Sequence, residues 1–262
     1  MKKVALSGVK SIVAISSGKG GVGKSTVAAS LAHGLSDLGL QIGLLDADIF
    51  GPNIPSMMSM IDRPKIIEMP DGVEFFEPPS VDGIKIMSMG SLVESDEPMI
   101  WRGPKLHEVI QQFTSQVYWG ECDILLIDMP PGTGDVQLSV AQILPLNGAV
   151  IVTTPQDLAV DDVKRSIHMW QKVNVPILGI VENFSEFVCP KCGKSHLVFG
   201  SGGADELSDR FVTEVIGRIP LAANNSNPVN LAKTDEFRNL TKSLIRLLSG
   251  AAKAETPVIG KF

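Results

Sequence analysis

Short apolar segments recur along the chain and alternate with longer segments in which the apolar residues follow a helical spacing. The segments expected to form strands are 12–15, 41–45, 84–89, 123–128, 149–153, 177–181 and 215–217. The segments expected to form helices are 27–38, 102–118, 136–144, 157–172, 203–211 and 231–249. Strands that alternate with helices indicate βαβ units, so we predict an α/β fold with one mostly parallel sheet of about seven to eight strands and helices on both faces.

Two further segments follow neither period. Residues 56–83 are rich in Met and Pro, and we expect them to be irregular and to include a surface excursion. Residues 250–262 follow the last predicted helix and are expected to form a flexible tail. The apolar positions of that last helix, 231–249, have the spacing of a helix that packs onto a sheet.

The first predicted strand leads into a glycine-rich loop that contains the spacing G-x-x-x-x-G-K-[ST], and a predicted helix follows it directly. In such a loop the backbone N–H groups bind phosphate oxygens, the lysine reaches the β- and γ-phosphates, and the hydroxyl binds Mg²⁺. We therefore predict that residues 1–262 form a single P-loop domain that binds ATP. The predicted nucleotide-binding residues of the loop are Gly18, Lys19, Gly20, Gly21, Val22, Gly23, Lys24, Ser25 and Thr26.

Carboxylates stand at the carboxyl ends of two predicted strands, where open α/β sheets bind their ligands. We predict that Asp46 and Asp128 join Ser25 in the Mg²⁺ site, and that Asp48 orients the attacking water during catalysis, in which Lys24 also takes part. The alternative is that these aspartates cap turns or helices. In the loop after Asp128, Gly132 is expected to sense the γ-phosphate through its backbone N–H.

Composition excludes several classes of protein. Hydrophobic residues make up 44% of 262 residues, which supports a large core, and the net charge of −6 argues against binding to nucleic acid. Three cysteines do not form the framework of a secreted disulfide protein. The N-terminus lacks the apolar core of a signal peptide and no apolar run has the length of a membrane span, so we expect a cytoplasmic protein that binds no membrane.

Cys189 and Cys192 form a C-x-x-C pair in a predicted loop at about 185–200. Such a pair is typical of a redox dithiol, half of a zinc site or half of an iron–sulfur site. A redox dithiol needs the pair to open a helix, which a loop does not provide. Two copies of the chain could bring four thiolates together across a two-fold axis, or His196 could complete a zinc site, although an exposed His196 is the favoured interpretation. Cys122 is expected to be a small packed residue.

The glycine loop, with its additional Lys19, resembles the deviant Walker A motif of the MinD/ParA/nitrogenase iron protein class of ATPases. Longer stretches resemble the Mrp-type iron–sulfur cluster carriers within that class, and the resemblance extends from about residue 10 to 220. These stretches are 46–53, 101–104, 127–135, 154–157, 181–184 and 189–193.

The resemblance implies roles that the residues alone do not. It implies that Lys19 reaches across a homodimer to the partner's nucleotide and assists catalysis, and that Asn183 contacts adenine. It also implies that Cys189 and Cys192 of two subunits hold one bridging [4Fe–4S] cluster, with Zn²⁺ as a possible substitute, and that the cluster passes to apoproteins under the control of ATP. Two alternatives stay open at this point: a positioning ATPase of the MinD/ParA kind, and an ATPase dimer clipped by zinc.

Overall fold

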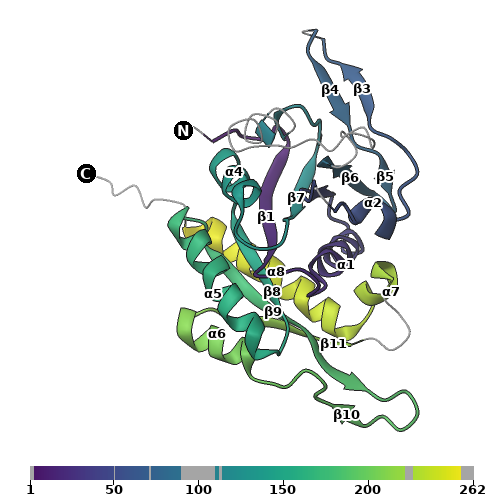
Figure 1. The fold of residues 1–262 in the computed structure, drawn as a ribbon. Coiled ribbons are helices and arrows are strands. Elements are labelled where there is room, and N and C mark those ends of the chain that lie inside the picture. The colour runs from purple at the N-terminus through teal and green to yellow at the C-terminus, as the bar shows by residue number, and fades with distance from the viewer. Residues whose placement is uncertain are drawn as a thin grey trace.

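The computed structural model describes residues 3–49, 51–70, 72–89, 110–111, 114–221 and 227–254. Within them, nine strands form the main sheet (Figure 1). They are β1 (Val9–Ser17), β2 (Ile42–Asp46), β5 (Ser80–Val81), β6 (Ile84–Ser88), β7 (Cys122–Asp128), β8 (Gly148–Thr153), β9 (Ile177–Val188), β10 (Ser195–His196) and β11 (Val215–Leu221). The order is β10-β9-β8-β1-β7-β2-β6-β5, and β11 also pairs with β9.

Seven of these strands run parallel to their neighbours, from β11 through β9, β8, β1, β7 and β2 to β6. The short strands β5 and β10 are antiparallel. Every residue of β2 and β8 is buried, as expected for parallel strands covered on both faces. The predicted fold class is thereby confirmed, with β1 near the middle of the sheet and its carboxyl end at the glycine loop.

Helices cover both faces of this sheet (Figure 1). They are α1 (Lys24–Ser36), α2 (Ile54–Met57), α4 (Asp135–Ile143), α5 (Asp157–Lys172), α6 (Gly203–Phe211), α7 (Pro228–Ala232) and α8 (Asp235–Ala254). Residues of α4, α5 and α6 share one apolar cluster with Ile12 and Ala14 of β1. Residues of α1, α7 and α8 share a second cluster with Val13 and Ile15. Because successive residues of a strand point to opposite faces, β1 contributes to both layers of the core.

The prediction that residues 56–83 are irregular was wrong. Part of this segment forms a hairpin of two antiparallel strands, β3 (Lys65–Glu68) and β4 (Glu74–Glu77). The hairpin extends away from the main sheet, at the upper right of Figure 1. The surface excursion is therefore present, but it has regular structure.

Three predicted boundaries also differ from the structure. The strand predicted at 177–181 continues to Val188, because β11 and β10 supply hydrogen-bonding partners beyond that point. The helix predicted at 231–249 is divided, and α8 begins after Thr234, whose Oγ1 accepts a hydrogen bond from the N–H of Phe237 (3.4 Å). The same helix continues to Ala254, so residues 250–254 are helical, whereas 255–262 lie outside the described residues.

The helix predicted at 102–118 lies mostly outside the described residues. Of that segment, 110–111 and 114–115 are helical, and the chain leaves the helix before Val117, which forms an isolated bridge with Phe76. The stretch 101–104, which carried part of the family resemblance, is also outside the described residues. Within the described part of the chain, no helix is long and apolar enough to cross a membrane.

Candidate nucleotide site and cysteine hairpin

The glycine loop joins the carboxyl end of β1 to α1, which begins at Lys24. Gly21 and Gly23 have φ angles of 79° and 80°, a conformation that glycine adopts without the strain of a side chain. Gly18 packs against α5 so closely that a Cβ would lie 2.5 Å from the carbonyl carbon of Asp162 and from the nitrogen of Val163. The glycines therefore serve both the tight turn and the close packing of the loop on α5.

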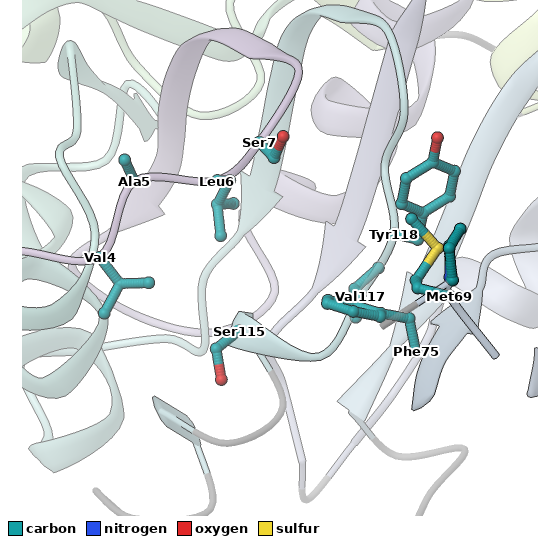
Figure 2. A pocket seen from close by; sticks show the side chains of 10 residues that line it. Val4, Ala5, Leu6, Ser7, Met69, Phe75, Ser115, Val117 and Tyr118 are labelled. Carbon is teal, nitrogen blue, oxygen red and sulfur yellow. The ribbon is translucent and has the colours of Figure 1, made fainter. Parts of the chain in front are cut away.

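The loop lines a cavity of about 240 Å³. Its lining includes all the predicted nucleotide-binding residues from Lys19 to Thr26, together with Asp48, Asn53 and Pro131. Gly18 and Asn183 are not among the lining residues. A larger cavity of about 490 Å³ lies elsewhere, between residues 4–7, the β3–β4 hairpin and residues 115–118 (Figure 2), and no predicted site residue lines it.

Lys24, which lines the 240 Å³ cavity of the glycine loop, forms a buried ion pair with Asp128. Lys24 Nζ lies 2.5 Å from Asp128 Oδ1, and the two side chains are 8% and 1% exposed. Ser25 Oγ lies 3.5 Å from the same Nζ. Burial raises the pKa of the Asp128 carboxyl, and Lys24 offsets part of that rise. Three predicted residues thus meet at one point, and a carboxylate beside a hydroxyl is an oxygen donor set that suits Mg²⁺.

Asp46 is completely buried, and its two carboxylate oxygens accept hydrogen bonds from backbone N–H groups. Oδ1 accepts from Asp48, and Oδ2 accepts from Asn53 and Ile54, each at 3.1 Å. The pKa of Asp46 is raised to about 7, mainly by burial and to a smaller extent by the charge of the nearby Asp128. Asp46 therefore holds the turn after β2 in place, which is the capping role that the sequence left open as an alternative, and its part in binding Mg²⁺ stays a prediction.

Four other predicted site residues lie in the glycine loop or near it: Lys19, Asp48, Gly132 and Asn183. Asp48 lines the cavity, and its Oδ1 accepts a hydrogen bond from the N–H of Gly51 (3.2 Å). Lys19 Nζ donates to Gln156 Oε1 at 3.4 Å, and the N–H of Gly132 donates to the carbonyl of Ser17 at 3.1 Å. Asn183 Nδ2 donates to the carbonyl of Val22 at 2.9 Å. The roles of these four residues toward a nucleotide stay predictions.

Cys189 and Cys192 lie at the turn of the hairpin formed by β9 and β10, at the lower end of Figure 1. The N–H of Cys189 donates to the carbonyl of Lys194 (2.9 Å), and the N–H of Gly193 donates to the carbonyl of Cys189 (2.8 Å). Backbone N–H groups of Lys191 and Cys192 and the Cys192 side chain lower the pKa of the Cys189 thiol. The turn thus favours a thiolate close to the surface, and the thiolate is the form of cysteine that binds metal.

Within the described part of one chain, Cys189 and Cys192 have no third side chain beside them that could complete a metal site. Among the described residues, no group of three or more His, Cys, Asp or Glu side chains could hold a metal ion. His196 is exposed in β10, as favoured from the sequence, and does not complete a site with the cysteines. Cys122 is packed in the core, and burial raises its pKa to about 11. A metal at the hairpin therefore needs further ligands from outside this chain's described residues.

Sequence reasoning missed two aromatic residues beside the glycine loop. Phe184 and Phe199 line another cavity beside the loop, of about 290 Å³, together with Lys19 and residues 20–22 of the loop. In the sequence, one phenylalanine precedes the C-x-x-C pair and the other follows it. That arrangement alone does not indicate a binding or catalytic role.

A central parallel strand, a glycine loop, a helix that starts at the loop lysine and an aspartate at the end of the adjacent strand define a P-loop NTPase domain. The particular family follows from comparison with known proteins. The ParA family model described as the NUBPL iron-transfer P-loop NTPase matches residues 8–246, so the chain belongs to that family. The resemblance seen in the sequence is thereby confirmed.

Relatives with curated names are similar over most of their length. An iron-sulfur cluster carrier protein of Methanocaldococcus jannaschii is 46% identical over 256 residues, which cover 94% of this chain and 87% of the relative. An iron-sulfur cluster carrier protein of Pseudomonas fragi is 45% identical over 235 residues, covering 87% and 80%. The iron-sulfur cluster transfer protein NUBPL of Dictyostelium discoideum is 43% identical over 257 residues, covering 94% and 79%.

Solved structures support the same fold. A nucleotide-binding protein from Archaeoglobus fulgidus, in complex with ADP, has a TM-score of 0.70 and 38% identity, with 88% of each chain covered. The cell division ATPase MinD of Pyrococcus furiosus has a TM-score of 0.62 at 20% identity, covering 90% of this chain and 99% of the other. At that identity the second match shows the shared fold alone.

Proposed function

We propose that this protein is an ATPase that carries an iron–sulfur cluster and transfers it to apoproteins in the cytoplasm. The observation that carries the proposal is the pair of Cys189, which is half-buried, and Cys192, which is exposed, on a chain that also has a P-loop site. Two thiols from each of two copies make four, the number that holds a [4Fe–4S] cluster. Relatives named as cluster carrier and transfer proteins support this assignment.

The cluster is the cargo of this protein, and the chain's contribution is to hold it reversibly at a surface. Hydrogen bonds that lower the pKa of Cys189 favour the thiolate that binds iron. Cys192 is exposed, so a recipient protein can approach the site directly. Zn²⁺ binds the same kind of thiolate pair, so it is the competing occupant of this site, and the protein would then be a dimer held together by zinc.

ATP binding requires Lys24 to exchange its partner. In the structure Lys24 is paired with Asp128, and in the proposed complex it contacts the β- and γ-phosphates. Ser25, Asp46 and Asp128 would then hold Mg²⁺, which would neutralise phosphate charge. Asp48, which lines the cavity, orients the attacking water, and Gly132 contacts the γ-phosphate after leaving Ser17. Lys19 completes the partner subunit's site, and Asn183 contacts adenine.

Cluster binding is tested by anaerobic reconstitution with iron and sulfide, followed by iron and sulfide analysis and the visible spectrum. The wild type is expected to bind about two iron atoms per chain, which is one [4Fe–4S] cluster per dimer. The double variant Cys189→Ala/Cys192→Ala should bind none, and Cys122→Ala is the matched control because Cys122 lies in the core. Equal and low binding by wild type and double variant would contradict the proposal.

Transfer is tested separately, by mixing the reconstituted protein with a model apoprotein in the presence and absence of ATP. The recipient should gain the cluster spectrum while the carrier loses it. For the ATPase, Lys24→Ala should abolish productive ATP binding, whereas Asp48→Ala should slow hydrolysis more than binding. Identical affinity and turnover in these two variants would show that the roles of Lys24 and Asp48 are assigned wrongly.

A further inference from the structure

One strand connects the glycine loop to the cysteine hairpin. β9 is paired with β8 as far as Glu182, opposite Thr153. Beyond that point Asn183 and Phe184 contact the glycine loop, and the same strand continues to Val188, next to Cys189. Cys189 lies five positions after Phe184 along extended chain, a span of roughly 16 Å.

Phe184 has a backbone conformation that is unusual for a bulky residue. Its φ angle is 58°, in the left-handed region, which a bulky residue adopts only where the surrounding structure imposes it. The residues before it are fixed: Glu182 is 4% exposed and accepts a hydrogen bond from Arg218 Nε at 3.1 Å, and Asn183 donates to Val22. The bend at Phe184 is therefore imposed where the strand leaves β8 and meets the loop.

Both arms of the cysteine hairpin reach the glycine loop. On the outgoing arm, a Cβ built on Gly23 would lie 3.4 Å from Phe184 Cζ, so the ring rests against the last turn of the loop. On the returning arm, Phe199 packs against Phe184 with ring centroids 6.1 Å apart and planes inclined by 47°. Phe199 also shares the 290 Å³ cavity with residues 19–22 of the loop.

We propose that Phe184 and Phe199 are positioning residues that couple the nucleotide state of the glycine loop to the reactivity of Cys189 and Cys192. This inference rests on the proposed function, in which ATP controls the cluster. Binding of phosphate draws the backbone N–H groups of the loop toward one point and shifts Val22 and Gly23. The shift moves the Asn183 amide and the Phe184 ring that contact them.

The hairpin transmits that shift because its two arms are tied together near the tip. Cys189 and Lys194 are joined by a backbone hydrogen bond, and β10 pairs with Val188 and Phe187. A rotation at the strained Phe184 therefore displaces the turn as a unit, which changes the N–H groups around Cys189 and the exposure of Cys192. Phe199 makes the returning arm move together with the outgoing arm, because it contacts both the loop and Phe184.

The coupling is tested without any cluster, by alkylation of the reduced apoprotein with iodoacetamide under anaerobic conditions. Modification of Cys189 and Cys192 is followed by peptide mass spectrometry, with Mg²⁺–ATP, with Mg²⁺–ADP and without nucleotide. In the wild type we expect ATP to change the alkylation rates by about fivefold relative to nucleotide-free protein. In Phe199→Ala that ratio should fall close to one when it is measured at an ATP concentration that saturates the variant.

Leu197→Ala is the matched control, because Leu197 is on the same arm and 59% exposed. It should keep the wild-type response to ATP. Phe199→Tyr retains the ring and should restore the response, a rescue that a general loss of stability does not predict. If circular dichroism shows that Phe199→Ala does not fold, Phe199→Leu is compared with Phe199→Tyr in its place.

Two results would overturn the coupling: a wild-type protein whose alkylation is unaffected by ATP, or ring-less variants at position 199 that keep the full response. These results differ from failure of the proposed function. A wild type that binds no cluster but shows the ATP-dependent alkylation refutes the carrier and supports the coupling. A wild type that binds a cluster through Cys189 and Cys192 but shows no response supports the carrier and refutes the coupling.

Discussion

The buried pair of Lys24 and Asp128 gives the sharpest quantitative prediction, because it can be tested without nucleotide or metal. The two side chains are 8% and 1% exposed and their charged atoms are 2.5 Å apart. Lys24→Met removes the ammonium group and leaves the carboxylate buried. Asp128→Asn removes the negative charge and leaves the ammonium group without its partner.

Removing one member of a buried ion pair costs about 3–5 kcal/mol, since the remaining charge has lost its compensation. For a chain of this size, a loss of 3 kcal/mol corresponds to a fall in Tm of roughly 6–12 °C. The double variant Lys24→Met/Asp128→Asn leaves neither charge, so its cost should be smaller than the sum of the two single costs by about 2 kcal/mol.

The cost of Lys24→Met should also depend on pH. Burial already raises the pKa of Asp128, and loss of Lys24 raises it further. A folded-state pKa above the unfolded value means that stability is lost as pH rises toward that folded-state pKa. The penalty of Lys24→Met, relative to wild type, is therefore expected to grow as pH rises above about 4, the unfolded-state pKa of an aspartate.

Urea titrations followed by circular dichroism measure these costs. Lys10→Ala is the matched control: Lys10 forms an ion pair with Asp123 at 2.7 Å, but its side chain is 74% exposed. That variant should cost far less than either variant of the buried pair, because solvent screens an exposed ion pair. Single variants of Lys24 and Asp128 that each cost no more than Lys10→Ala would show that the buried pair does not stabilise the apoprotein.

Three further predictions concern the packing of the loop, the turn after β2 and the cysteines. Gly18→Ala places a Cβ 2.5 Å from the backbone of α5 and should lower the free energy of unfolding in urea by more than about 2 kcal/mol. Because the pKa of Asp46 is raised to about 7, the wild type loses stability as pH rises from about 4 to about 7. The non-titrating Asp46→Asn should gain roughly 2–4 kcal/mol relative to it over that range. Iodoacetamide should modify Cys189 far faster than the buried Cys122 in native protein, as measured by peptide mass spectrometry.

Each of these has its own control. Gly134→Ala, where a Cβ would meet no atom within 4 Å, should leave stability almost unchanged, and an equal effect at Gly18 would contradict the packing argument. A constant difference between Asp46→Asn and wild type at every pH would show that Asp46 does not titrate near neutrality. Comparable modification of Cys122 and Cys189 would mean that the core around Cys122 opens readily.

The placement of the glycine loop beside Asp128 could be predicted because it follows from local rules. The glycine loop is a contiguous motif, and Asp128 ends an apolar strand whose carboxyl end must lie at the same edge of the sheet. Those two facts are sufficient to bring Lys24 and Asp128 together. The carboxylate of Asp46 could not be assigned in the same way, since its backbone partners Asn53 and Ile54 come from a turn without a recognisable period.

The missed elements depend on contacts that the sequence does not mark. β3 and β4 have four residues each and Ile66 is 65% exposed, so no alternation of buried and exposed positions identifies them. The start of α8 did have a signal, a threonine followed by two acidic residues at 234–236, which is typical of a helix N-terminus. The meeting of Phe184 with Phe199 depends on a hairpin closed by a strand of two polar residues, which no periodicity predicts.

The position of β1 has a consequence for how the chain is made. This strand is synthesised before both of its partners, β7 and β8, and Val9 pairs with Cys122 more than one hundred residues later. At a translation rate of about 5–20 residues per second, the segment waits roughly 6–20 s for its first neighbour. During that time its apolar residues 12–15 are exposed as the nascent chain grows. We therefore expect protection by ribosome-associated chaperones to matter more for the yield of this protein than for folds whose first strands form a hairpin.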